Sequence, residues 1–176
     1  MGPTQINGLP AHILLVHVVV VLVPLTALAL IGCAVWPSWM RRMGLALPIL
    51  ALATLVSVPL TTHAGEWLEK HTASTPLIRK HTELGDGLLP WAIGLFVLAA
   101  GLWWWNRRTT AASTGSRTGG GSGTAALATP LRIAAAVLCA AVAVGAVVQV
   151  YRIGDSGAKA AWTGNFSQSK VSGQHR

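Results

Sequence analysis

Histidine is the residue type in this chain that could most readily do chemistry, because a neutral imidazole can ligate a metal ion or haem iron near neutral pH. Of the 6 histidines in the chain, all except His175 lie near the ends of long apolar segments or in the connection between two of them. These residues are His12, His17, His63, His71 and His81. If the apolar segments cross a membrane in alternating directions, these histidines all lie at the same end of the molecule.

The elements that must position these histidines are transmembrane helices. Hydrophobic residues make up 52% of the chain and charged residues 10%, a balance far from that of soluble proteins. Nearly all charges lie outside four apolar segments, at residues 11–35, 44–62, 88–105 and 133–150. Each has about 18 to 25 residues, enough to cross a hydrocarbon core of about 30 Å. The sequence therefore predicts an all-α polytopic membrane protein in which residues 1–176 form one four-helix transmembrane bundle.

Tryptophans and small residues support this interpretation. Tryptophan is enriched where helices leave the hydrocarbon, and here it follows or closes each apolar segment, at Trp36, Trp39, Trp67, Trp103, Trp104, Trp105 and Trp162. In the fourth segment, small residues recur about every four positions, at Ala136, Ala140, Ala141 and Gly145. Such a face lets helix backbones approach closely in lipid, so we expect it to pack inside the bundle.

Basic residues indicate how the bundle lies in the membrane. The first and third connections carry arginines and no acid, at Arg41, Arg42, Arg107, Arg108, Arg117 and Arg132. The positive-inside rule therefore predicts that both connections face the cytoplasm and that both termini are extracytoplasmic, in the inner (plasma) membrane. The net charge of +8 is explained by topology and contact with the lipid bilayer. No basic stripe interleaved with aromatic residues is present, so no nucleic-acid partner is expected.

Two stretches are predicted to lie outside the spans. Residues 112–125 are rich in Gly, Ser and Thr, a composition that buries too little apolar surface to offset the entropy of ordering, so we expect a flexible loop. Residues 155–176 follow the fourth segment and are expected to form an extramembrane tail.

The depth of each histidine selects the candidate ligands. His17 lies about 9 Å into the first helix at about 1.5 Å per residue, and His63 lies close to the exit of the second. Thr75 followed by Pro76 is typical of a helix start, which would place His81 within the first two turns of a helix. We therefore expect His17 and His81 to face each other as principal ligands, with His12 or His63 as third candidates. His12 and His17 differ by about 140° around a helix, so they are not expected to share one position.

The chemistry that such a cluster could carry is binding of haem b or a transition metal, with a redox or electron-transfer role and another membrane or redox protein as partner. The carboxylates of Glu66 and Asp155 lie at the same end of the bundle and could hold the imidazoles in one tautomer. Neither a nucleophile motif nor a paired-cysteine motif is present in the sequence, so catalysis is not expected.

The alternative is a non-catalytic scaffold or an accessory subunit of a larger membrane complex. In that interpretation the same histidines and Asp155 join helix ends by hydrogen bonds, each worth roughly 0.6 to 2 kcal/mol in a membrane. A proton-coupled transporter is a weaker third interpretation, because no Asp, Glu, Lys or Arg occurs at mid-membrane depth.

Several short motifs, spread over nearly the whole chain, resemble a known family. They are Asn7-Gly-Leu-Pro-Ala-His12, Leu15-Val-His17, Thr61-Thr-His-Ala-Gly-Glu66, His81-Thr-Glu-Leu-Gly85, Leu89-Pro-Trp91 and Gly154-Asp-Ser-Gly-Ala158. This pattern is similar to the bacterial integral membrane family named domain of unknown function 2231, and the Ala, Gly and Arg bias is that of an actinobacterial-like member. The resemblance implies a four-span bacterial membrane protein with no assigned activity.

The resemblance also singles out particular residues. It implies that His12, His17 and His81 are the recurrent histidines, whereas His63 and His71 are less typical of the pattern. It further implies that residues 154–158 form a turn, and that this turn and Trp162 fold the tail back onto the end of the molecule that carries the histidines.

Overall fold

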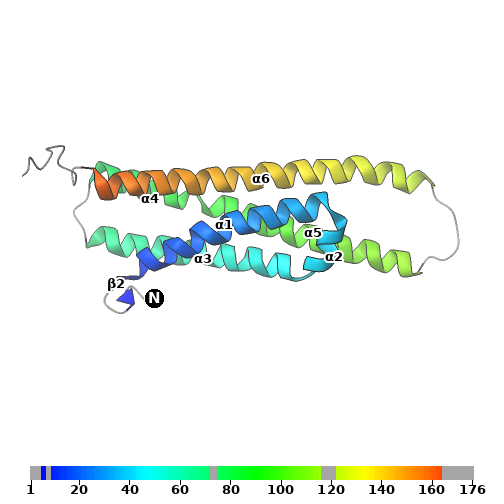
Figure 1. Ribbon diagram of the computed structural model, residues 1–176, viewed down its shortest axis with the longest axis horizontal. Helices are drawn as coiled ribbons and strands as arrows, with labels where there is room; N and C mark the ends of the chain where they lie inside the picture. Colours follow the sequence, from blue (N-terminus) through cyan, green and yellow to red (C-terminus); the bar gives the residue numbers. More distant parts are fainter. Residues whose placement is uncertain (1–4, 7–8, 72–74, 116–121, 164–176) are drawn as a thin grey trace, which may run out of the picture.

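The chain forms an all-α membrane bundle, as the sequence predicts (Figure 1). This computed structural model describes residues 5–6, 9–71, 75–115 and 122–163. A short antiparallel pair, β1 (Gln5–Ile6) and β2 (Leu9–Pro10), leads into the first helix. The helices are α1 (Ala11–Val35), α2 (Pro37–Met43), α3 (Ala46–Lys70), α4 (Pro76–Asp86), α5 (Leu89–Gly115) and α6 (Ser122–Trp162).

The four long helices, α1, α3, α5 and α6, run back and forth along one axis (Figure 1). Helix α1 packs against α3 and α6, and α5 closes the arrangement by packing against both α3 and α6. The short α4 lies on the C-terminal part of α6. One end of the bundle therefore collects the start of α1, the end of α3, all of α4 and the end of α6. We call it the histidine end, because it contains His12, His63, His71 and His81.

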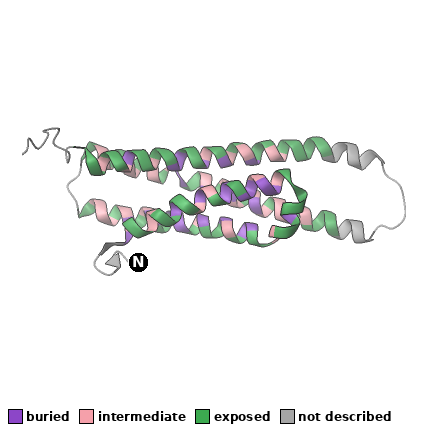
Figure 2. Cartoon of the chain, viewed as in Figure 1, coloured by how far each residue is buried: buried purple, intermediate pink, exposed green. Residues whose placement is uncertain are grey.

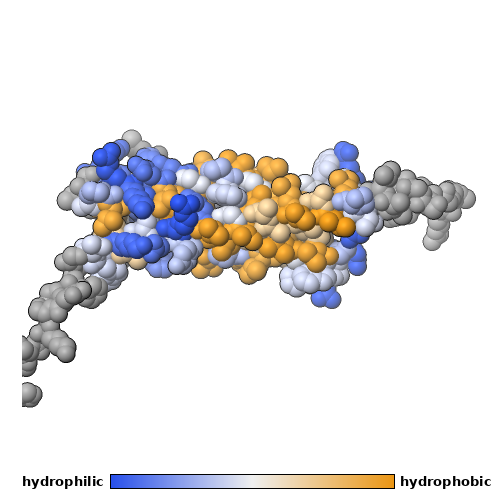
Figure 3. Space-filling model, turned by 90° about the horizontal axis from the view of Figure 1, so that it is seen from above, coloured by the Kyte–Doolittle hydropathy of each residue, from blue (hydrophilic) through white to orange (hydrophobic). Residues whose placement is uncertain are grey.

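All four long elements are long and apolar enough to cross a membrane. The molecule has an apolar belt between two more hydrophilic ends (Figure 3), and large apolar side chains on the belt point outward, for example Leu28 at 67% exposure and Val137 at 64%. Outward-facing leucine and valine on every long helix are expected where the surrounding solvent is lipid.

The helices extend beyond the apolar segments. Helix α6 has 41 residues, which at about 1.5 Å per residue is about twice the hydrocarbon thickness. Helix α3 likewise continues to Lys70, past the apolar segment that ends near residue 62. A helix that has already formed adds one hydrogen bond for each further residue, so it can continue into water. The histidine end therefore consists of helices that project out of the lipid.

This extension adds helical structure to two stretches that the sequence places outside the spans. Within the stretch 112–125, expected to be a flexible loop, α5 continues to Gly115 and α6 begins at Ser122, and residues 116–121 lie outside the described residues. The expected tail 155–176 is helical as far as Trp162, and residues 164–176 lie outside the described residues.

Helix α2 reverses the chain at the end opposite the histidines. Trp39 on α2 packs against Gly32 on α1, where a Cβ atom would lie 2.5 Å from the indole ring. Gly44, which ends α2, has a φ of 49°, a left-handed conformation that favours glycine. Arg41 and Arg42 lie in the last turn of α2, where positive charge is favourable next to the helix dipole.

The core between the long helices is built largely from small residues. Figure 2 shows buried positions concentrated in the middle of the bundle. On α6 they recur at Cys139, Ala143, Ala146 and Val150, which belong to the same apolar cluster as leucines from other helices, such as Leu30 and Leu95. Spacings of four and three place these residues on one helical face. Small residues on this face allow close backbone approach, which drives helix association in lipid.

Polar side chains within the core also join helices. The hydroxyls of Thr26 on α1 and Thr54 on α3 are hydrogen-bonded at 2.7 Å, and both side chains are fully buried. Gln149 of α6 donates from Nε2 to the carbonyl of Leu84 at 2.8 Å, which satisfies an acceptor in the last turn of α4. Buried polar groups in lipid need such partners.

Gly145 provides a direct test of the packing of α6. The indole ring of Trp91 occupies the place of a side chain at residue 145, whereas Ala141 of the same small-residue stripe is exposed. We expect Gly145→Leu to lower stability by about 1 to 3 kcal/mol, because Trp91 would have to move. The measurement is the midpoint of thermal unfolding in detergent. Gly101→Leu is the matched control, since Gly101 on α5 is exposed and has no atom within 4 Å of a Cβ position; equal stability of both variants would contradict this packing.

Candidate functional site

His12 and His81 lie side by side at the histidine end of the bundle. Their ring centroids are 6.3 Å apart, and the ring planes are inclined by 82°. His12 is in the first turn of α1 and His81 is in the second turn of α4, and both are half-buried. Residues 69 positions apart in the sequence, from two different helices, are thus brought together by the fold.

The imidazole of His12 is held by α3. Its Nδ1 lies 3.0 Å from the carbonyl oxygen of Thr61, and because a carbonyl can only accept, Nδ1 carries the hydrogen and donates it. The ring rests on Gly65, one helical turn further along α3, where a Cβ atom would lie 3.1 Å from Cε1 and Nδ1. The carbonyl and the glycine therefore fix both the tautomer and the position of this ring.

The imidazole of His81 is held by α6 in the same way. Its Nδ1 donates to the carbonyl oxygen of Ile153 at 3.1 Å and lies 3.0 Å from the hydroxyl oxygen of Ser156. Ser156 itself donates to the Ile153 carbonyl at 2.8 Å. The ring packs against Gly157, where a Cβ atom would lie 3.0 Å from Cε1. Each imidazole is therefore anchored through Nδ1 to a helix carbonyl beside a glycine.

Local sequence determines where α4 presents His81. The hydroxyl of Thr75 accepts from the backbone N–H of Ile78 at 3.3 Å, and Pro76 occupies the first helical position, so the helix start predicted from the sequence is confirmed. At the other end, the Gln149 bond to the Leu84 carbonyl fixes α4 on α6.

Burial and the neighbouring imidazole influence the charge of His81. Helix α4 carries Arg79, Lys80, Glu83 and Asp86 in 11 residues, so it lies outside the hydrocarbon, and α5 is the span that follows. Burial, and then the proximity of His12, lower the pKa of His81 from its ordinary value of 6.5, against a smaller opposing effect of the Ile153 carbonyl. The neutral form of His81 is therefore favoured, and the bond to the Ile153 carbonyl places its hydrogen on Nδ1, which leaves a lone pair on Nε2.

The other expected ligands do not join this pair. His17 is exposed, and its Nδ1 donates to the carbonyl of Ile13 in its own helix at 2.6 Å. The structure therefore pairs His81 with His12 and not with His17, which points about 140° away from His12 around α1. His63 is exposed as well, and its Nδ1 lies 4.0 Å from the carboxylate of Glu66.

Glu66 lies 4.0 Å from the imidazole of His63, as their spacing of three residues predicts, but neither Glu66 nor Asp155 forms a hydrogen bond or ion pair with His12 or His81 among the described residues. Glu66 is exposed next to His63, and Asp155 accepts from Lys159 on its own helix at 2.7 Å. Within the described parts of the chain, no group of three or more His, Cys, Asp or Glu side chains could hold a metal ion. Within the part of the chain that the structure describes, His12 and His81 are the only two imidazoles of this end that lie side by side.

The groups that hold the pair were not identified from the sequence. Backbone carbonyls such as those of Thr61 and Ile153 leave no trace in residue identity. The glycines did leave a signal, because Gly65 and Gly157 lie in two of the motifs quoted above. Residues 154–158 lie within α6 and do not form the expected turn, yet they do contact His81. Because most of these side chains are small, α6 can pack closely against His81 as a regular helix, without a turn.

Comparisons with known proteins agree with this architecture. A family model described as "Predicted membrane protein (DUF2231)" matches residues 8–170. No curated protein and no solved structure matches the chain. The matched segment includes His12, His81 and the segments of α3 and α6 that hold them.

The burial of His81 predicts a pH dependence of stability. Because its pKa is lowered in the folded protein, the unfolded chain takes up a proton first as the pH falls below 6.5. The contribution of neutral His81 to the free energy of unfolding should therefore be fully present above pH 6.5. It should be lost as the pH falls toward the lowered pKa of His81. Histidine titrates between about pH 5 and pH 8, so thermal unfolding should be measured over this range. The wild type should show the decrease in stability, and His81→Gln should show a smaller one. The exposed His17→Gln variant should behave as the wild type; an unchanged pH profile in His81→Gln would contradict the assignment.

Proposed function

We propose that this chain, which belongs to the DUF2231 family of predicted membrane proteins, binds a transition-metal ion or a haem iron between His12 and His81. The observation that carries the proposal is the shared geometry of the two rings. Each donates from Nδ1 to a backbone carbonyl, and the Nε2 of neither ring has a hydrogen-bond partner among the described residues. Metal-ligating histidines are commonly oriented this way, with one nitrogen fixed by a carbonyl and the other facing the metal.

The separation of the rings supports the same proposal. A metal ion lies about 2.0 Å from a ligating imidazole nitrogen and hence about 3.1 Å from the ring centroid. Two imidazoles that share one ion have centroids at most about 6.2 Å apart, and the edge-to-face pair of His12 and His81, at 6.3 Å, lies at about that limit. Iron, copper and zinc all accept imidazole ligands. An iron or copper ion at one membrane face would suit electron transfer with another membrane or redox protein.

A second function is favoured by a different property of the same residues. His12 connects α1 to α3 through Thr61, and His81 connects α4 to α6 through Ile153. The contact between the rings then joins these two pairs of helices. A non-catalytic scaffold or accessory subunit would need this junction for rigidity alone, with no bound ion.

Metal binding can be tested with four single variants. Protein expressed with ample haem and metal, then purified in detergent, should show Soret absorption or bound metal by elemental analysis. His12→Gln and His81→Gln should each lose most of the bound group, at least about tenfold, because one of two ligands is removed. His17→Gln and His63→Gln are matched controls, since both residues are exposed, and these variants should retain it.

The same variants separate the two functions. Wild-type protein with neither Soret absorption nor metal would refute the metal site. If His12→Gln and His81→Gln then still lowered the free energy of unfolding, by roughly 0.6 to 2 kcal/mol per lost bond, the scaffold would be the better description. Loss of the bound group in His17→Gln would instead show that the ligands were assigned to the wrong residues.

We further propose that the histidine end faces the outside of the inner (plasma) membrane. At the opposite end of the bundle, α2 carries Arg41 and Arg42, and α5 carries Arg107 and Arg108. Two of these guanidinium groups lie over indole rings, Arg107 over Trp103 at 5.1 Å and Arg108 over Trp104 at 4.8 Å. Arginine next to interfacial tryptophan is expected on the cytoplasmic side, which would leave both termini extracytoplasmic.

Cysteine labelling in intact cells tests this orientation. Cys33 and Cys139 are both buried and would first be replaced by alanine. Single cysteines would then be placed at Thr163, at the end of α6, and at Thr110, near the end of α5, both of which are exposed. A membrane-impermeant thiol reagent should label Thr163→Cys and not Thr110→Cys, and permeabilised cells should show labelling of both. The reverse pattern would place the histidine end in the cytoplasm.

A further inference from the structure

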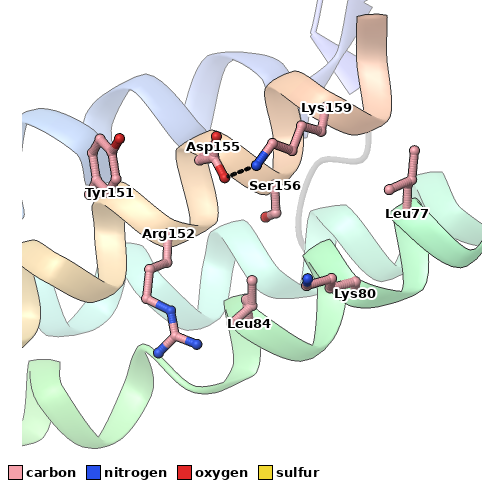
Figure 4. A pocket seen from close by; sticks show the side chains of 8 residues that line it. All are labelled: Leu77, Lys80, Leu84, Tyr151, Arg152, Asp155, Ser156 and Lys159. Carbon is pink, nitrogen blue, oxygen red and sulfur yellow. Dashed lines mark hydrogen bonds and ion pairs between the residues drawn. The ribbon is translucent and has the colours of Figure 1, made fainter. Parts of the chain in front are cut away.

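A pocket lies between α4 and α6 on the outer side of the histidine end (Figure 4). Its volume is about 160 Å³, which is below the roughly 300 Å³ of typical small-molecule sites. The residues around it are Leu77, Lys80 and Leu84 from α4 and Tyr151, Arg152, Asp155, Ser156 and Lys159 from α6. A pocket of this size suits one compact polar group and not a whole cofactor.

The charges around this pocket do not balance. Three basic side chains face one carboxylate, and that carboxylate, Asp155, already accepts from Lys159 at 2.7 Å. Lys80 and Arg152 have no ion-pair partner within the described residues. Figure 4 shows Arg152 extending from α6 toward α4 beside Leu84, and Lys80 at the neighbouring turn of α4. Two cations that line one pocket without an ion-pair partner favour the binding of an anion there.

The depth and the apolar lining of the pocket indicate where the anion comes from. The apolar segment of α6 ends at Val150, so Tyr151 and Arg152 lie where this helix leaves the hydrocarbon. Tyr151 is 74% exposed, as expected of a tyrosine in the interfacial belt of a membrane protein. Leu77 and Leu84 supply apolar walls above it. At the boundary between hydrocarbon and water, the abundant anions are the headgroups of phospholipids. Their acyl chains would lie against the apolar side chains next to the pocket.

We propose that this pocket binds the phosphate group of an anionic phospholipid, with Lys80 and Arg152 as its ligands. Arg152 can present two parallel N–H donors to one phosphate, and Lys80 supplies a further charged donor. Tyr151 and Leu84 lie beside the glycerol and the first acyl carbons. This site shares Ser156 with the surroundings of His81, but it does not require that a metal is bound to the imidazole pair.

Lipid titration of the full-length protein tests the proposal. Phosphatidylglycerol, phosphatidylcholine and inorganic phosphate would each be titrated into the protein in neutral detergent, with the midpoint of thermal unfolding as the readout. Phosphatidylglycerol should raise the midpoint in a saturable manner, and the other two should raise it little. In Lys80→Gln/Arg152→Gln, the concentration of phosphatidylglycerol needed for half of the shift should rise at least about tenfold, because two charged hydrogen bonds are lost.

A second double variant controls for general surface charge. Lys70→Gln/Arg79→Gln removes the same charge from exposed residues at the same end of the bundle, neither of which lines the pocket. It should respond to phosphatidylglycerol as the wild type does. An equal loss in both double variants, or an equal shift with phosphatidylcholine, would overturn the proposal. A shift of the same size with inorganic phosphate alone would also overturn it, because the site would then bind a free anion and not a lipid.

A single variant is used if the double pocket variant is poorly folded. Arg152→Lys retains the positive charge but loses the two parallel N–H donors. Native mass spectrometry of this variant should show weaker retention of phosphatidylglycerol than in the wild type. Unchanged retention would contradict the assignment of Arg152.

Discussion

Lipid surrounds the middle of this molecule, so its helices gain nothing from the hydrophobic effect by packing against one another. What holds them together must come from close backbone approach and from polar bonds that lipid cannot replace. The structure supplies both: a small-residue face on α6 and a hydroxyl pair, Thr26 with Thr54, between α1 and α3. The indole of Trp91 fits against Gly145 for the same reason, since only the absence of a side chain there lets a large ring come so close to α6.

The histidine end follows the same rule outside the lipid. Gly65 and Gly157 leave room for an imidazole on the surfaces of α3 and α6, and a carbonyl next to each glycine accepts from that ring. Helices α3 and α6 can hold the imidazoles because they remain helical past their apolar segments. Each glycine therefore lies one helical turn after the carbonyl that accepts from the ring. Had α3 stopped near residue 62, as its apolar segment does, Gly65 would not be presented in helical register to His12. Helix extension is therefore what makes the pair of imidazoles possible.

Much of this could be read from the sequence, and the reason for each success or failure is physical. The four spans follow from hydropathy, and the presence of His12 and His81 at one end follows from alternating passes. The helix start at Thr75 follows from capping chemistry. The pairing itself does not follow, because rotation about a helix axis decides whether His12 or His17 faces inward, and that rotation is set by tertiary packing. The carbonyls of Thr61 and Ile153 are equally invisible, since every residue has one.

Ser156 links the two proposed sites, because it lines the pocket between α4 and α6 and also lies 3.0 Å from Nδ1 of His81. Lys80 and Arg152 carry like charges on these two helices, so without an anion between them they oppose the contact that presents Ile153 and Ser156 to His81. A phosphate bound there would neutralise this repulsion and favour the arrangement in which His81 is anchored. The Gln149 bond to the Leu84 carbonyl acts in the same direction from the membrane side of α4. The orientation of the imidazole that is proposed to ligate a metal would therefore depend on the lipid around the bundle.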